Sequence, residues 1–162
     1  MSTLVLTVTL NPSIDRTINL SSLNVGQINR AESITLDPGG KGVNVSRAAH
    51  ATGAPTHAVL VCGELGSSWM DGHLTRAGIP HTIVEGGESV RSNMTIVSAD
   101  GVVTKINEPG SALTDHQLNQ VKSAITSQPL KGAWVALAGR LNPGLAPDTY
   151  KDLAKLARDA GA

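Results

Sequence analysis

Short apolar runs alternate with segments of helical periodicity along most of the chain. Strands are predicted at runs rich in Val, Leu, Ile and Ala, at residues 3–10, 58–61, 81–84 and 133–138. Apolar residues recur at helical spacing in the segments that follow or separate these runs, at residues 41–52, 68–76, 114–125 and 147–160. This alternation predicts an α/β fold in which a mostly parallel sheet lies between helices.

Two groups of shorter alternating segments depart from this pattern. Strands with a partly exposed face are predicted at residues 17–20 and 28–36. Residues 94–98 and 102–106 flank Ala99-Asp100-Gly101, a sequence typical of a hairpin turn. We expect these segments to form a small accessory sheet.

The composition suits one soluble domain. The 162 residues are 40% hydrophobic and have a formal net charge of zero, without the basic patch that would indicate a nucleic-acid partner. No apolar run approaches the about 20 residues that a membrane span needs, and the N-terminus lacks a secretion signal, so we expect a cytoplasmic protein. The single cysteine, Cys62, follows strand-like residues and is expected to be a buried structural thiol.

A glycine-rich turn directly precedes the predicted helix at residues 41–52. The stretch reads Asp37-Pro38-Gly39-Gly40-Lys41-Gly42-Val43-Asn44-Val45. Glycines let the backbone approach a ligand closely, and a helix that begins there directs unpaired N–H groups and the positive end of its dipole at that ligand. Lys41 adds a full positive charge, so the turn is predicted to bind a polar ligand.

Two other polar motifs adjoin predicted strands. Asn11-Pro12-Ser13-Ile14-Asp15 follows the first strand, which places Asp15 where that strand ends. Arg91-Ser92-Asn93 precedes the strand-like run at residues 94–97. Because open α/β sheets bind ligands at strand ends, we expect both motifs to lie near the glycine turn.

In this order and spacing, the motifs T-x-N-P-S-I-D, G-G-K-G-x-N-V and R-x-N resemble the N-terminal half of the phosphofructokinase B group of ribokinase-like sugar kinases. The resemblance covers the whole chain and is greatest to the 1-phosphofructokinases, followed by the tagatose-6-phosphate kinases. It implies a ribokinase-like three-layer sandwich with a small β lid, whose strands lie near residues 16–36 and 91–107. The lid is expected to pair two copies of the protein into a homodimer.

The activity that the resemblance implies is phosphorylation of a phosphosugar by ATP with Mg²⁺. Fructose 1-phosphate, converted to fructose 1,6-bisphosphate, is the expected substrate. A tagatose-6-phosphate or fructose-6-phosphate kinase is an alternative, and a non-catalytic fragment that binds a phosphosugar is another.

Gly161 is a helix stop one residue before the last residue. We therefore expect residues 1–162 to be the N-terminal part of one kinase domain, inactive alone, with the nucleotide-binding part and the general base beyond Ala162.

The resemblance also implies which residues bind the substrate: Asp15, Gly39, Gly40, Lys41, Asn44 and Arg91. Asp15 and Asn44 would bond sugar hydroxyls, the two glycines would offer backbone N–H groups, and Arg91 would bind the phosphate through its guanidinium. For each of these residues, a role without ligand binding is the simpler alternative. Asp15 would form a turn, the glycines an ordinary helix entry, and Asn44 would be solvated at the helix N-terminus. Lys41 and Arg91 would be solvated at the surface.

One position departs from the family pattern. Where the family usually shows S-G-S-x-P-x-G, this chain has Ala138-Gly139-Arg140-Leu141-Asn142-Pro143-Gly144. Either the contact made by the small hydroxyl is lost, or Arg140 is a second phosphate ligand.

Other mechanisms have little support in the sequence. A Walker phosphate loop needs Ser or Thr after its Gly-Lys, and Gly42 follows Lys41. No G-x-G-x-x-G motif indicates a dinucleotide site, and the five histidines lack metal-ligand spacing.

Overall fold

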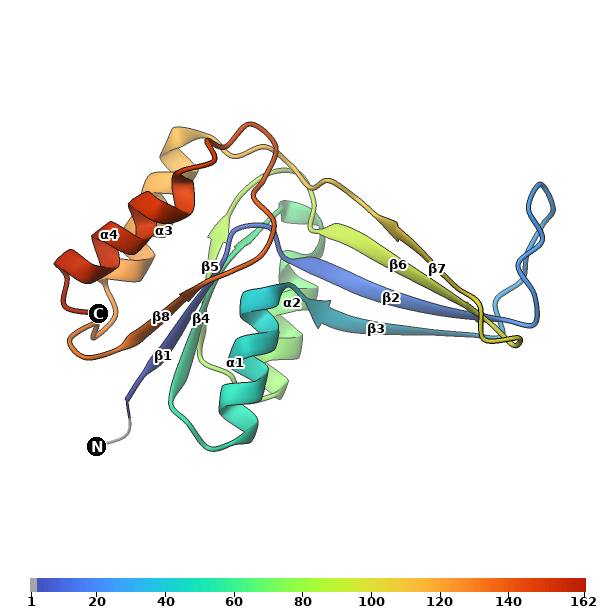
Figure 1. The fold of residues 1–162 in the computed structure, drawn as a ribbon, viewed down its shortest axis with the longest axis horizontal. Helices are drawn as coiled ribbons and strands as arrows, with labels where there is room; N and C mark the ends of the chain where they lie inside the picture. The colour runs from blue at the N-terminus through green and yellow to red at the C-terminus, as the bar shows by residue number, and fades with distance from the viewer. Residues whose placement is uncertain (1–2) are drawn as a thin grey trace.

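A computed structural model describes residues 3–162 and shows a layered body from which a second sheet projects (Figure 1). The elements in chain order are β1 (Val5–Thr9), β2 (Ser13–Leu20), β3 (Ser33–Gly39), α1 (Lys41–Ala51), β4 (Thr56–Cys62), α2 (Glu64–Arg76), β5 (His81–Glu85), β6 (Arg91–Ser98), β7 (Val103–Asn107), α3 (Asp115–Thr126), β8 (Trp134–Leu137) and α4 (Thr149–Asp159). No helix in this described part of the chain is both long and apolar enough to cross a membrane.

The body is a parallel sheet between two layers of helices, as predicted. Its strand order is β5-β4-β1-β8, and every neighbouring pair is parallel. Helices α1 and α2 cover one face, and α3 and α4 cover the other (Figure 1). Alternate residues of one strand divide between these faces: Val59 and Val61 pack toward α3 and α4, whereas Leu60 packs with Val43 and Met70 under α1 and α2. The aliphatic composition is therefore explained by a sheet that is buried on both faces.

The local signals for turns and helix ends are confirmed. Helix α1 begins at Lys41, and Gly53 beyond its end has a φ of 78°. Thr114 and Gln117 form the predicted capping box, in which the Thr114 hydroxyl accepts from the Gln117 N–H and the Gln117 side chain accepts from the Thr114 N–H. Helix α2 begins four residues earlier than predicted, at Glu64, but Leu65 and Gly66 are not helical.

The second sheet is the predicted lid, and we use that name for strands β2, β3, β6 and β7. Its order is β3-β2-β6-β7, with β2 and β6 parallel at the centre and β3 and β7 antiparallel at the edges. Two strands extend further toward the body than predicted. Strand β2 begins at Ser13 and β6 at Arg91, because these two residues are already paired in the parallel ladder.

Two sequence-based placements in the lid are wrong. The strand expected at residues 28–36 runs instead from Ser33 to Gly39, and Ile28 is 83% exposed in the preceding loop. Asp15 was expected at the end of the first strand, but it is the third residue of β2. Residues 10–12 connect β1 to β2, so the Ser13-Ile14-Asp15 part of the polar motif belongs to the second sheet.

Buried hydroxyls connect β1, α1 and β4. The Ser46 hydroxyl lies 2.7 Å from that of Thr7 and 3.0 Å from that of Thr56, which also donates to the Val5 carbonyl at 2.8 Å. Ser46 and Thr7 are fully buried. Burying a hydroxyl without a partner is costly, so these contacts favour one position of α1 on the sheet.

We predict that Ser46→Ala lowers the free energy of unfolding by about 1–3 kcal/mol, because it leaves the buried Thr7 hydroxyl without its partner. Adding Thr7→Val should recover part of that loss, since both hydroxyls are then absent. Urea unfolding followed by circular dichroism measures both effects. Ser123→Ala is the control, because the Ser123 side chain is exposed on α3. Equal costs for Ser46→Ala and Ser123→Ala would contradict the prediction.

Candidate functional site

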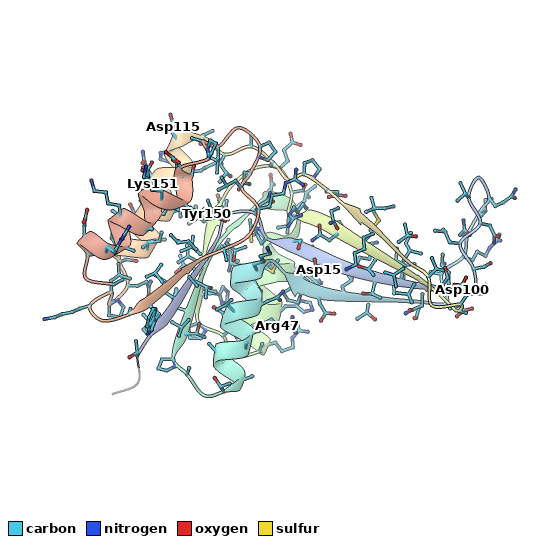
Figure 2. The ribbon with its side chains drawn as sticks, viewed as in Figure 1. Asp15, Arg47, Asp100, Asp115, Tyr150 and Lys151 are labelled. Atoms are coloured by element: carbon cyan, nitrogen blue, oxygen red, sulfur yellow. The ribbon has the colours of Figure 1, made fainter. Side chains whose placement is uncertain are left out.

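A cavity of about 430 Å³ lies where the lid meets the body. It is lined by Asn11, Asp15, Gly40, Lys41, Asn44, Arg91, Asn93, Asn107, Gly139 and Arg140. These residues come from the end of β1, the lid strands, the first turn of α1 and the loop after β8. Figure 2 shows Asp15 at the base of the lid beside α1, and Asp100 at the far end of the lid.

Six of the predicted substrate-binding residues line this cavity, and Gly39 does not. Gly39 is buried and pairs with Ser13, on the same face of the lid as Asp15, and a Cβ atom there would overlap the Asp15 carboxylate. The absence of a side chain at Gly39 therefore gives the carboxylate room.

The glycine turn brings the first turn of α1 close to β1. Gly40 is the N-cap residue, with a φ of 115° that favours glycine, and a Cβ there would lie 2.8 Å from the Thr9 methyl. A Cβ on Gly42 would overlap the Thr9 hydroxyl. No side chain among residues 3–162 caps the helix, so its first N–H groups and the positive end of its dipole remain available at the cavity, beside Lys41 and Asn44.

Asp15 uses one of its two carboxylate oxygens within the protein. Its Oδ1 accepts from the Ser13 hydroxyl at 2.7 Å and from the Asn93 amide at 3.0 Å. Its Oδ2 accepts no hydrogen bond from residues 3–162. Asp15 lies within a strand and lines the cavity, so a role in forming a turn does not describe it.

Arg91 is half-buried, and its guanidinium is held by neutral acceptors. Nε donates to the Asn11 carbonyl at 3.2 Å, and Nη1 donates to Asn93 Oδ1 at 2.9 Å and to the Glu108 carbonyl at 3.2 Å. The pKa of Arg91 is lowered, mainly by burial. The negative charge of Asp15 opposes this shift, whereas the positive charge of Arg140 adds to it. An arginine remains protonated at neutral pH despite such shifts. The cavity thus contains a fixed cation.

Arg140 adds a second positive charge to the same cavity. In the part of the chain that the structure describes, neither Arg91 nor Arg140 forms an ion pair with a carboxylate. Two guanidinium groups that repel each other and lack a paired carboxylate suit a bound anion, which each can bind through two N–H groups.

The loop that carries Arg140 is fixed by contacts at both ends. Tyr150 donates its hydroxyl to the Ala138 carbonyl at 3.3 Å, and the Asn142 amide donates to the Ser111 carbonyl at 2.8 Å. The Asn11 amide donates to the carbonyls of Pro109 and Leu141, at 2.9 and 3.4 Å. These contacts hold the loop after β7 against the loop that carries Arg140.

Sequence reasoning missed four residues that line the cavity: Asn11, Asn93, Asn107 and Gly139. A signal was present for Asn93, because R-x-N within a strand puts both side chains on one face. Asn107 carried no such signal, since it reaches the cavity only through the pairing of β7 with β6, opposite Asn93.

A cavity of about 510 Å³ lies elsewhere, between α2, β5 and α3. Glu64 and Glu85 line it, and two carboxylates would repel a phosphate.

Cys62 is buried in the cluster beneath α1 and α2. Burial raises the pKa of its thiol to about 12 and keeps it protonated, as expected for a structural thiol.

Comparison with known proteins finds relatives along the whole chain. A 1-phosphofructokinase from Rhodobacter capsulatus is 33% identical, and the match covers 100% of this chain and 52% of that enzyme. The structure of phosphofructokinase-2 from Escherichia coli in complex with fructose-6-phosphate matches with a TM-score of 0.90 and 25% identity, over 99% of this chain and 53% of that one.

The ribokinase from Giardia lamblia, at 16% identity, shares the fold with a TM-score of 0.75 over 99% of this chain and 51% of that one. The predicted ribokinase-like fold is thus confirmed. The chain spans about half the length of the relatives that it matches.

The family match includes every residue that lines the cavity. It extends over residues 8–162 and is to the pfkB family of carbohydrate kinases. A match of this extent agrees with the three motifs that meet at the cavity, and it shows that the chain belongs to this family.

Proposed function

We propose that the full-length protein phosphorylates a phosphosugar, with fructose 1-phosphate as the acceptor and fructose 1,6-bisphosphate as the product. The observation that supports this most is the placement of Arg91 and Arg140 on the same cavity as Asp15. A phosphate and several hydroxyls are the groups that such a set would bind. The 1-phosphofructokinase of Rhodobacter capsulatus supports the choice of sugar. Fructose 6-phosphate, present in the Escherichia coli structure, and tagatose 6-phosphate are the alternative acceptors.

The contribution of this chain is to bind and orient the acceptor. Oδ2 of Asp15 accepts a sugar hydroxyl, the Asn44 amide pairs with a second, and the N–H groups at the start of α1 contact the sugar. The arginines bind the existing phosphate. Fixing both ends of a substrate in this way lowers the entropic cost of aligning a hydroxyl for phosphoryl transfer. No residue of this chain is assigned as the general base.

We also propose that ATP with Mg²⁺ is the phosphoryl donor, as in a sugar kinase. Residues 3–162 contain no group of three or more His, Cys, Asp or Glu side chains placed to hold a metal ion. We assign none of the described residues to the nucleotide or to the metal. In this proposal residues 1–162 are the N-terminal part of one kinase domain, and the rest of the full-length protein binds the nucleotide.

A phosphosugar-binding fragment without activity is the second candidate. It is favoured by the fact that the residues proposed for the acceptor all belong to a chain about half as long as its relatives. An assay for ADP formation by the longer protein separates the two, because the kinase proposal expects turnover there and a binding protein without activity shows none.

A homodimer through the lid is also proposed. The pairing register places Leu36, Arg16, Met94 and Ile106 in one row and Ile34, Ile18, Ile96 and Thr104 in the next, on the lid face opposite Asp15. Ile34 is 52% exposed and Ile106 48% exposed. A second copy would cover this mainly apolar face by a symmetric contact.

Asp15→Ala in the full-length protein should reduce kcat/KM for the acceptor by an amount equal to about 2–4 kcal/mol, because the hydrogen bonds to sugar hydroxyls are lost. The affinity for ATP should remain close to that of the wild type. Asp100→Ala, at the far end of the lid, is the matched control. A loss smaller than about threefold would contradict the role of Asp15.

Arg91→Lys and Arg91→Ala should raise the KM for fructose 1-phosphate about tenfold or more, since lysine cannot bind phosphate through two N–H groups at once. Any activity on free fructose should be unchanged. If Arg140 is the main phosphate ligand, Arg140→Ser will show the larger loss. Arg76→Ala, at an exposed position near the end of α2, is the control. Equal losses on fructose and fructose 1-phosphate would refute the substrate class.

Ile34→Lys combined with Ile106→Lys should convert the full-length protein from a dimer to a monomer, because two buried charges would lack partners in the interface. Light scattering at micromolar concentrations measures the mass. Thr35→Lys, on the other face of β3, is the control and should leave the dimer intact. A monomeric wild type at high micromolar concentration would rule out the proposed dimer.

A further inference from the structure

Opposite charges stand close together at the base of the lid without forming an ion pair. Strands β2 and β6 are parallel there, with Ser13 paired to Arg91 and Asp15 paired to Asn93. Residues two apart in a strand share a face, so Arg91 and Asp15 are diagonal neighbours on the same surface. In a half-buried position their attraction is considerable. Even so, none of the ion pairs within residues 3–162 joins these two side chains.

The side-chain amide of Asn93 connects the two charged groups. Its Oδ1 accepts from Arg91 Nη1 at 2.9 Å, and its Nδ2 donates to Asp15 Oδ1 at 3.0 Å. Only this orientation of the amide presents an oxygen to the cation and an N–H to the anion.

Neighbouring groups support the same arrangement. The hydroxyl of Ser13, which is fully buried, accepts from Asn93 Nδ2 at 3.0 Å and donates to Asp15 Oδ1 at 2.7 Å. On the other side, the carbonyls of Asn11 and Glu108 accept from the Arg91 guanidinium. Each charged group thus has several neutral partners that hold it in place.

We infer that Asn93 is a positioning residue that keeps Arg91 and Asp15 from pairing with each other. A direct guanidinium–carboxylate pair is normally bidentate and would use the donors and acceptors that a substrate needs. With the amide between them, Oδ2 of Asp15 and Nη2 of Arg91 make no hydrogen bond to another described residue. Asn93 therefore keeps the site ready for a ligand with hydroxyls at one end and a phosphate at the other.

This inference rests on the proposed function for the identity of that ligand, but not for the behaviour of the two side chains. Inorganic phosphate is therefore the appropriate probe, because it tests whether Arg91 is available without requiring any particular sugar. Asn93→Leu removes the amide with little change in size and leaves Arg91 to pair with Asp15.

In the full-length protein, Asn93→Leu should weaken phosphate binding about tenfold, measured by NMR titration. Adding Asp15→Asn should restore most of that binding, because Arg91 is released. Asp15→Asn alone should strengthen binding much less, since in the wild type Arg91 is already available. If Asp15→Asn strengthens phosphate binding more in the Asn93→Leu variant than in the wild type, the cause is an Arg91–Asp15 ion pair. Simple removal of a negative charge would have the same effect in both proteins. Asn19→Leu is the matched control, because the Asn19 amide lies on the same face of β2 and donates to the Ser33 hydroxyl, away from both charged groups.

A crystal structure of the Asn93→Leu variant provides the second measurement. Direct contact between the Arg91 guanidinium and the Asp15 carboxylate is expected, at ion-pair distance. Separate side chains in that structure, or equal effects of Asp15→Asn in both backgrounds, would overturn the inference. If instead the phosphate pattern holds but the wild type binds no phosphosugar, the proposed substrate is wrong and the role of Asn93 stands.

Discussion

The candidate site depends on the parallel pairing of β2 with β6. This ladder joins segments about eighty residues apart in the chain, from Ser13 opposite Arg91 to Leu20 opposite Ser98. It brings the polar motif after β1 onto the same face as the R-x-N motif. A shift of one residue in the register would turn one of the two sets to the opposite face of the lid. The placement of Asp15 and Arg91 on one surface therefore depends on the register of these two strands.

The glycine turn supplies the third part of the site, and its position depends on close packing in the body. Thr9 at the end of β1 lies against Gly40 and Gly42, where side chains would overlap it. This contact brings the start of α1 close to the lid. Rigid strands and a helix terminus thus position the charged groups, as precise orientation of a substrate requires.

The electrostatic character of the cavity follows from which charges are paired. Arg91 is bonded to neutral acceptors, and Asp15 is bonded to a hydroxyl and an amide. Neither charge is neutralised by a direct contact within the described chain. Arg140, which replaces the small hydroxyl of the family pattern, adds to the positive charge near Arg91. In this chain the positive charge of the cavity is therefore shared between a lid strand and the loop after β8.

Much of the fold and part of the site followed from local sequence signals. The βα alternation, the start of α1 and the capping box at Thr114 depend on residues within a few positions of each other, so periodicity and capping chemistry were sufficient to predict them. The family resemblance, in turn, pointed to six of the residues that line the cavity.

The tertiary structure decided the rest, because strand pairing and packing join residues that are distant in sequence. It placed Asp15 inside β2 rather than at the end of β1, and it moved the start of β6 to Arg91. It brought Asn107 to the cavity through the pairing of β7, and it placed Gly39 against the Asp15 carboxylate. The sequence by itself determined the chemical groups, whereas their distances, and hence which charges stay unpaired, were determined only by the register of the lid and its junction with the body.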